Sequence, residues 1–187
     1  MNLYVVRHGQ TDWNIQGLIQ GSTDIELNSA GIEQAKQTAE ILKDICFSTI
    51  YSSPLKRTID TAKTINKYHN IDIITDKRLI ERNFGDFEGT QNLLKNISDY
   101  LDVSLNLDTH NVESIKTLLK RVEKFLLDIY IKYKDSDSNI LVVTHGGVGI
   151  AITAVINNVK ENLASLGMKN CEVKIFKNLK LDVNKEN

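Results

Sequence analysis

The fold of this chain is decided by the stretch Leu3-Tyr4-Val5-Val6-Arg7-His8-Gly9-Gln10-Thr11-Asp12-Trp13-Asn14. The apolar run ends at Arg7, which predicts a short buried strand with an arginine and a histidine at its carboxyl end. Ligands of open α/β sheets bind at that edge. Gly9 lets the backbone approach a ligand closely, and the polar turn after it supplies hydrogen-bonding groups. We therefore expect an anion site in which the guanidinium grips the anion and a neutral imidazole nitrogen attacks it.

Size and charge exclude several classes of protein. The chain has 187 residues, which suits one ordinary domain, and its 23 basic and 24 acidic residues give a net charge of −1. This balance argues against a nucleic-acid partner. No apolar run approaches the ~20 residues of a membrane span, and no leader pattern opens the chain. We expect a cytoplasmic protein without a membrane partner, in which Cys46 and Cys171 are free, buried thiols. The oligomeric state is left open.

Strand and helix patterns alternate along the chain. The sequence predicts strands near residues 49–52, 72–75, 139–144, 172–176 and 179–183, and helices near residues 30–44, 55–68, 91–101, 115–133 and 148–155. Asn28 or Ser29 is expected to cap the first helix, which turns Ile32 inward with Ala35, Ala39 and Leu42. Residues 15–28 read as a polar loop. This order indicates an α/β fold, a three-layer sandwich with a mainly parallel central sheet flanked by helices, in one domain over residues 1–187.

A second histidine repeats the opening pattern. Val142-Val143-Thr144-His145-Gly146 ends like Val5-Val6-Arg7-His8-Gly9, so neighbouring parallel strands would bring the two imidazoles together. Arg57 follows another strand on the same edge. A pocket with two histidines and two arginines in a nearly neutral protein suits a phosphoryl group, whose transfer depends on positioning and on charge stabilisation.

These motifs resemble those of the histidine phosphatase superfamily, also called the phosphoglycerate mutase-like family. The likeness covers about residues 1–90 and 112–180, and the motifs that carry it are Arg7-His8-Gly9-Gln10-Thr11, Ser52-Ser53-Pro54-Leu55-Lys56-Arg57-Thr58, the segment 81–89, and Thr144-His145-Gly146-Gly147. The resemblance implies a phosphoglycerate mutase-like fold. It also implies a short cap insertion at about residues 90–112, where the chain looks trimmed.

The resemblance implies roles for individual residues. His8 would be the nucleophile that forms a phosphohistidine, with its other ring nitrogen held by a backbone carbonyl. Glu81 would move the proton, and Glu88, seven residues further on, is the weaker alternative. Three further side chains would bind the phosphate oxygens: Arg7, Arg57 and His145. Four weaker candidates would contact the substrate in the same pocket: Asn14, Gln20, Gly21 and Gly146.

The sequence is compatible with several functions. We favour a phosphatase for a small phosphorylated metabolite, with no cofactor and no metal, because a trimmed cap admits water to the phosphohistidine. An α-ribazole phosphatase and a broad-specificity phosphomonoesterase both fit. The alternatives are a cofactor-dependent phosphoglycerate mutase and a non-catalytic module that binds phosphorylated ligands. A zinc site at His8 and His145 would need a third protein ligand.

Overall fold

The computed structural model describes residues 1–91 and 97–181. Its centre is a five-stranded sheet in the order β3-β2-β4-β1-β5, in which β5 alone runs antiparallel to its neighbour. The strands are β1 (Asn2–Arg7), β2 (Phe47–Ser52), β3 (Ile73–Thr75), β4 (Asn139–Thr144) and β5 (Val173–Phe176). The predicted mainly parallel sheet is confirmed.

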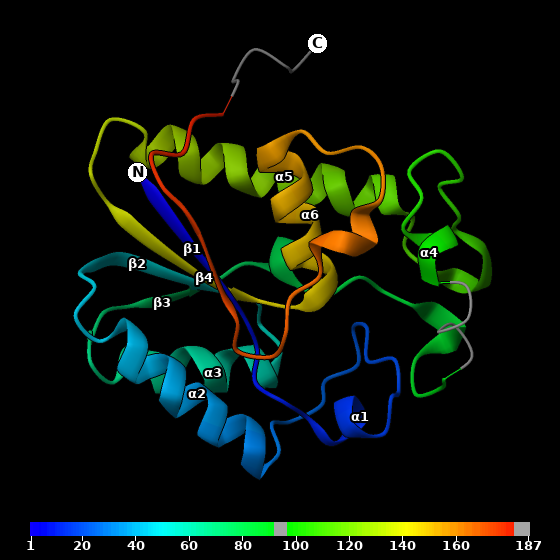
Figure 1. The fold of residues 1–187 in the computed structure, drawn as a ribbon, viewed down its shortest axis with the longest axis horizontal. Coiled ribbons are helices and arrows are strands. Elements are labelled where there is room, and N and C mark those ends of the chain that lie inside the picture. The colour runs from blue at the N-terminus through cyan, green and yellow to red at the C-terminus, as the bar shows by residue number, and fades with distance from the viewer. Residues whose placement is uncertain (92–96, 182–187) are drawn as a thin grey trace.

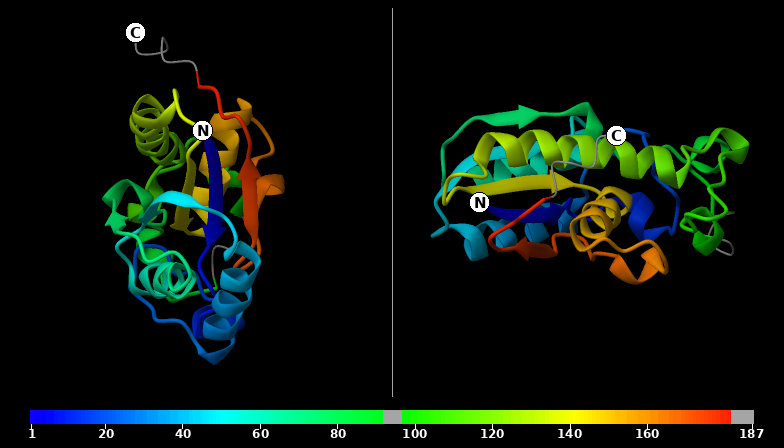
Figure 2. Two further views of the ribbon diagram at one scale, coloured as in Figure 1. Left: turned by 90° about the vertical axis from the view of Figure 1, so that its left-hand side faces the viewer. Right: turned by 90° about the horizontal axis from the view of Figure 1, so that it is seen from above.

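Helices cover both faces of the sheet, as predicted. The α-helices are α1 (Asp12–Ile15), α2 (Ser29–Leu42), α3 (Lys56–Asn66), α4 (Ile97–Tyr100), α5 (Ile115–Tyr133) and α6 (Gly146–Asn157). Short 3₁₀ turns lie at η1 (Lys77–Leu79), η2 (Gly85–Phe87), η3 (Thr109–Asn111) and η4 (Leu163–Leu166). Figure 1 shows α2 and α3 on one face and α5 and α6 on the other. In the right-hand view of Figure 2, the green segment that contains α4 lies beyond the end of the sheet.

Alternation along the central strands builds two hydrophobic cores. Leu3 and Val5 of β1 pack toward α5 and α6, whereas Tyr4 and Val6 pack toward α2 and α3. The same alternation runs through β4, whose Ile140 to Thr144 are all buried. Both strands are therefore apolar on both faces, the property that made them recognisable from the sequence.

Three local predictions were wrong. α1 lies where a polar turn was predicted after Gly9, because Thr11 and Asn14 form a reciprocal capping box that needs no apolar pattern. Residues 179–181 do not continue as a strand, since Leu179 leaves the sheet edge to fill the α5–α6 core; residues 182 and 183 lie outside the described residues. Ile32 is 45 % exposed, because α2 turns Gly31 instead against the backbone of Gln10.

The structure also bears on the predicted helix cap, on the helix predicted at residues 91–101 and on the two cysteines. Asn28 caps α2 by accepting a hydrogen bond from the amide of Gly31, as predicted. The helix predicted at residues 91–101 is seen only as α4, and residues 92–96 lie outside the described residues. Both cysteines are free, but Cys46 is exposed and Cys171 is half-buried, so the prediction of buried thiols was wrong. No helix in the described part of the chain is long and apolar enough to cross a membrane.

Candidate active site

The two histidines meet because their strands are parallel neighbours in register. Arg7 of β1 pairs with Thr144 of β4, so His8 and His145 leave the sheet side by side, with their ring centroids 5.3 Å apart. β2 pairs with the other side of β4 and ends beside it. Three adjacent carboxyl ends of parallel strands thus form one edge, where the sequence predicted the site.

His8 is held as a neutral base. Its ring is buried, and its Nδ1 lies 2.7 Å from the carbonyl oxygen of Gly9. A carbonyl only accepts hydrogen bonds, so Nδ1 carries the proton and Nε2 keeps its lone pair. Burial, together with the positive charges of Arg57 and Arg7, holds the pKa of His8 well below its ordinary value. The expected backbone carbonyl is therefore present, and it leaves one ring nitrogen able to attack.

His145 is fixed in the opposite tautomer. Nε of Arg57 donates to its Nδ1 at 3.2 Å, so Nδ1 is unprotonated and Nε2–H donates to Oγ of Ser53 at 2.8 Å. Burial, aided by the charge of Arg57, lowers the pKa of His145 well below its ordinary value. Both ring nitrogens already have partners within the protein. His145 orients Arg57, and its predicted contact with phosphate stays a prediction.

Arg57 is buried, and its guanidinium donates hydrogen bonds to three residues of the protein. It stands in the first turn of α3, and besides His145 it contacts the carbonyl oxygens of Thr23, at 2.7 Å from Nη1, and Gly21, at 2.8 Å from Nη2. Burial lowers its pKa to about 10, against the opposing effect of carboxylates including Glu81. Three of its five N–H groups are used in this way, which leaves two for a ligand.

Two buried polar atoms of predicted site residues have no hydrogen-bond partner within the part of the chain that the structure describes. Arg7 donates from Nη1 to the carbonyl oxygen of Met168 at 2.6 Å, yet its Nε is buried without a hydrogen bond. Oε1 of Gln20 is also buried and unpartnered. Because buried polar groups are nearly always satisfied in native proteins, such atoms indicate a place where a ligand or water completes the bonding.

Glu81 follows η1, and its carboxylate lies against the first turn of α6 at the same edge. Its Oε2 accepts from the amide of Gly147 at 3.0 Å, and its Oε1 accepts from the amides of Val148 at 3.2 Å and Arg82 at 2.8 Å. Two of these donors belong to the first turn of α6, whose amides favour negative charge. The half-buried carboxyl group is therefore fixed close to Gly146 and Arg7.

The weaker substrate candidates lie around this centre. Oδ1 of Asn14 accepts from the amide of Thr11 at 3.1 Å and from Nδ2 of Asn170 at 3.3 Å, so its own NH₂ group is the donor left for a ligand. Gly21 takes part through its carbonyl on Arg57. Gly146 begins α6, directly after His145. The structure brings all the predicted site residues to one region, and their contacts with substrate stay predictions.

Sequence reasoning missed the groups that hold this site together. Ser53 stood inside a quoted motif, so its closeness to the strand end was a signal that could have found it. The carbonyl of Met168 and the side chain of Asn170, which donates to the carbonyl oxygen of His8 at 3.0 Å, come from a segment without any pattern. Within residues 1–91 and 97–181, no three His, Cys, Asp or Glu side chains gather as metal ligands, so the third ligand of the zinc alternative is not found there.

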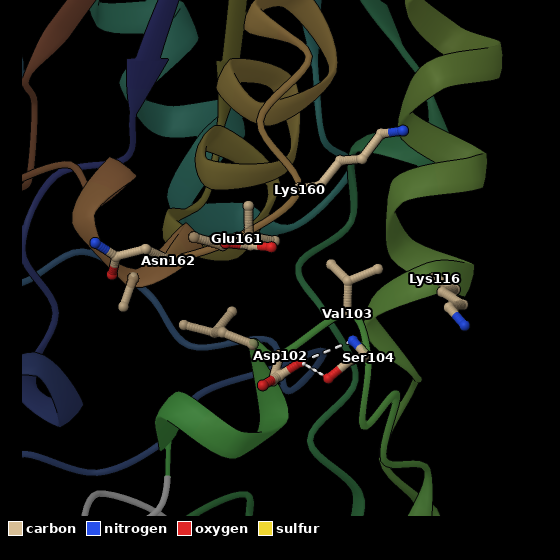
Figure 3. Close-up of a pocket in the computed structure, with 10 residues that line it drawn as sticks. Asp102, Val103, Ser104, Lys116, Lys160, Glu161 and Asn162 are labelled. Atoms are coloured by element: carbon tan, nitrogen blue, oxygen red, sulfur yellow. Dashed lines mark hydrogen bonds between the residues drawn. The ribbon is translucent and has the colours of Figure 1, made fainter.

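A separate cavity of about 710 Å³ lies beside α5. Figure 3 shows its three walls: residues 101–104 after α4, residues 160–164 after α6, and Lys116 of α5. No residue that lines it in the described part of the chain is a predicted site residue. It lies between the segment that follows α4 and the segment that leads to Met168, the residue that holds Arg7.

Comparison with known proteins agrees with this geometry. The family model of the histidine phosphatase superfamily (branch 1) matches residues 3–179. The chain is 36 % identical over 166 residues to "Uncharacterized phosphatase PhoE" of Bacillus subtilis, covering 89 % of this chain and 82 % of that protein. It is 41 % identical over 155 residues to "Phosphoglycerate mutase-like protein 4" of Arabidopsis thaliana, covering 78 % and 66 %.

A solved structure shows the same fold. The mycobacterial glucosyl-3-phosphoglycerate phosphatase in complex with VO₃ superposes with a TM-score of 0.83 at 29 % identity, covering 93 % of this chain and 91 % of that one. The predicted fold class is thus confirmed, as is the prediction of an enzyme of the phosphomonoesterase type. The chain belongs to the histidine phosphatase superfamily, branch 1.

Proposed function

We propose that this protein hydrolyses small phosphomonoesters through a phosphohistidine on His8. The observation that carries the proposal is the buried, neutral His8 ring, whose Nδ1 lies 2.7 Å from the carbonyl of Gly9, which leaves Nε2 as the nucleophilic atom, and whose pKa is lowered by burial and by the charges of Arg57 and Arg7. A neutral imidazole is a nucleophile at neutral pH without a separate base. Its cationic neighbours suit a phosphoryl group and repel a proton from the ring.

In the first step, Nε2 of His8 attacks phosphorus and the bond to the ester oxygen breaks. The free N–H groups of Arg57, together with the unpartnered Nε of Arg7, stabilise the charge on the equatorial oxygens. The leaving oxygen takes a proton from Glu81, the carboxyl group fixed at the start of α6.

In the second step, water attacks the phosphohistidine. Glu81, now ionised, accepts a proton from that water, the N–P bond breaks, and inorganic phosphate leaves with His8 neutral again. No metal ion or cofactor is needed in this scheme. We assign His8 as the nucleophile, Glu81 as acid and base, and Arg7 and Arg57 as the groups that bind the phosphate oxygens. His145 acts with them by orienting Arg57, and Asn14, Gln20, Gly21 and Gly146 are the candidates for further contacts with the substrate.

The short cap bears on the choice between hydrolysis and isomerisation. We place residues 1–187 in one domain with a short cap at about residues 90–112, and a short cap favours hydrolysis over a mutase reaction because it admits water. A phosphoglycerate mutase is the second candidate, favoured by the similarity to the Arabidopsis protein with that name. A cytoplasmic location also belongs to the proposal and is supported by the two free cysteines.

A substrate panel tests the proposal. Purified protein, treated with chelator, is assayed for phosphate release from sugar, nucleotide, amino-acid and carboxylic-acid phosphates, with α-ribazole phosphate included and His8→Ala as the control. We expect hydrolysis of at least one compound by the wild type and none by the variant. Isomerisation of 3-phosphoglycerate in the presence of bisphosphate primer, without phosphate release, would establish the mutase instead. Binding without turnover of any compound would establish the non-catalytic module.

A further inference from the structure

Glu88, the weaker candidate for the proton-transfer role, accepts hydrogen bonds from Ser22, Thr23 and Phe84. Its Oε1 accepts from the amide of Ser22 at 2.9 Å, from the hydroxyl of Ser22 at 3.1 Å and from the amide of Phe84 at 3.0 Å. Its Oε2 accepts from the amide of Thr23 at 2.9 Å and from the Thr23 hydroxyl. Five donors fill the roughly four lone-pair sites of a carboxylate, so no site is left for a substrate proton.

These donors hold Glu88 in its charged form. Burial opposes that charge, but the hydrogen bonds from Thr23, Ser22 and Phe84 together keep the pKa of Glu88 below its ordinary value. Removing an acceptor shared by five buried or half-buried donors would leave several of them unsatisfied. Glu88 therefore organises the loop at residues 21–23 and ties it to the segment that follows Glu81.

The same loop holds Arg57. The carbonyls of Gly21 and Thr23, on either side of Ser22, are the two acceptors for the terminal nitrogens of the guanidinium. Gly21 has a φ of +52°, and a Cβ built on it would lie 2.0 Å from Oε1 of Glu88, so the loop packs directly on the carboxylate. One carboxylate thus fixes the two residues that aim Arg57.

The geometry points to Glu88 as a positioning residue for Arg57: by clamping residues 21–23 it sets the direction in which the guanidinium presents its free N–H groups to the phosphoryl group. This inference rests on the proposed function, because the value of a fixed Arg57 lies in binding phosphate. Glu88 touches no reacting atom. Its effect passes through the loop carbonyls, and therefore exists only while Arg57 is present.

A double-mutant cycle tests this dependence. Glu88→Gln keeps the shape of the side chain but replaces one acceptor oxygen by a donor NH₂ that faces other donors. We expect kcat/KM for 4-nitrophenyl phosphate to fall about 10- to 100-fold and the inhibition constant for vanadate to rise, since a displacement of about 1 Å at a catalytic group costs about 100-fold. In an Arg57→Ala background, Glu88→Gln is expected to change kcat/KM less than twofold.

Two further variants keep the test decisive. Thr23→Val removes one hydroxyl donor but leaves the Thr23 carbonyl, so it serves if Glu88→Gln does not fold, with the same expected cycle and a smaller loss. Asp102→Asn is the matched control, because Asp102 also accepts from one hydroxyl and two amides, in the distant segment after α4. It is expected to retain wild-type activity.

The outcomes separate the inference from the function on which it rests. Equal losses from Glu88→Gln with and without Arg57 would show a purely structural role and overturn the inference, as would wild-type kinetics in Glu88→Gln, while hydrolysis by the wild type would leave the proposed function intact. A wild-type protein that hydrolyses no phosphomonoester would instead refute the proposed function itself.

Discussion

Arg57 donates a hydrogen bond from Nε to Nδ1 of His145, at 3.2 Å. This bond settles which nitrogen of His145 carries the proton, because a guanidinium cannot accept. The proton is on Nε2, which donates to Ser53. The two histidines of the site thus have complementary tautomers: His8 offers a lone pair at the centre, and His145 uses both nitrogens to fix the residues around it.

Ser53→Ala tests the tautomer of His145. The change removes the acceptor of Nε2–H and frees the ring that orients Arg57, so we expect kcat/KM for phosphomonoester hydrolysis to fall about 10- to 100-fold. Ser52→Ala is the matched control, since the buried Ser52 hydroxyl donates to the carbonyl of Ser53 at 2.9 Å. Steady-state kinetics of both variants give the answer. Equal, small effects would show that the hydroxyl of Ser53 does not matter for His145.

Glu81→Gln tests proton transfer to the leaving group. The variant cannot protonate an alkoxide, so kcat/KM for an alkyl phosphate is expected to fall about 10²- to 10⁴-fold. 4-Nitrophenolate leaves without a proton, so kcat/KM for 4-nitrophenyl phosphate should fall about tenfold or less. The measurement is kcat/KM for both substrates in wild type and variant, because kcat/KM reports the first step and is not affected by the loss of the base from the second. The same loss for both substrates would assign Glu81 a role other than general acid.

The two buried histidines should make the fold sensitive to acid. Their pKa values are lowered in the folded state, so below pH ~6.5 the unfolded chain takes up protons that the folded chain does not, and the free energy of unfolding falls as pH falls. Each ring contributes at most about 1.4 kcal/mol per pH unit. Urea unfolding of wild type and His8→Asn between about pH 7 and 5.5, a range that spans the ordinary pKa of histidine, measures how the free energy of unfolding depends on pH. Identical slopes in the two proteins would contradict the lowered pKa of His8.

Gly21→Ala tests the close packing of the loop on Glu88. Gly17→Ala is the control, because Gly17 also has positive φ, +66°, but among the described residues a Cβ there meets Gln91 alone, at 3.8 Å. We expect Gly17→Ala to lower the free energy of unfolding by about 1–2 kcal/mol from the left-handed backbone alone. Gly21→Ala should cost more and also reduce kcat/KM. Equal stability and activity in the two variants would show that the contact with Glu88 is not tight.

The sequence predicted those site residues that follow directly on a recognisable strand pattern. β1 and β4 are buried on both faces, and each is followed by a histidine and a glycine, so the sequence alone predicts that the two rings lie together. The hydrogen bonds that hold the site are long-range: Ser53 and His145 are 92 residues apart, and Ser22 and Glu88 are 66 apart. Such partners are brought together by tertiary packing, so no local sequence pattern predicts these hydrogen bonds.

The central claim is tested most directly by trapping the intermediate on His8. Wild-type protein is mixed with 4-nitrophenyl phosphate, quenched in alkali, where the N–P bond survives, and mapped by peptide mass spectrometry, with His8→Ala treated in parallel. We predict one phosphoryl group on the peptide that contains His8 during turnover, lost when substrate is exhausted and absent from the variant. Active turnover with no phosphoryl group on that peptide, or with the group on His145, would contradict the account.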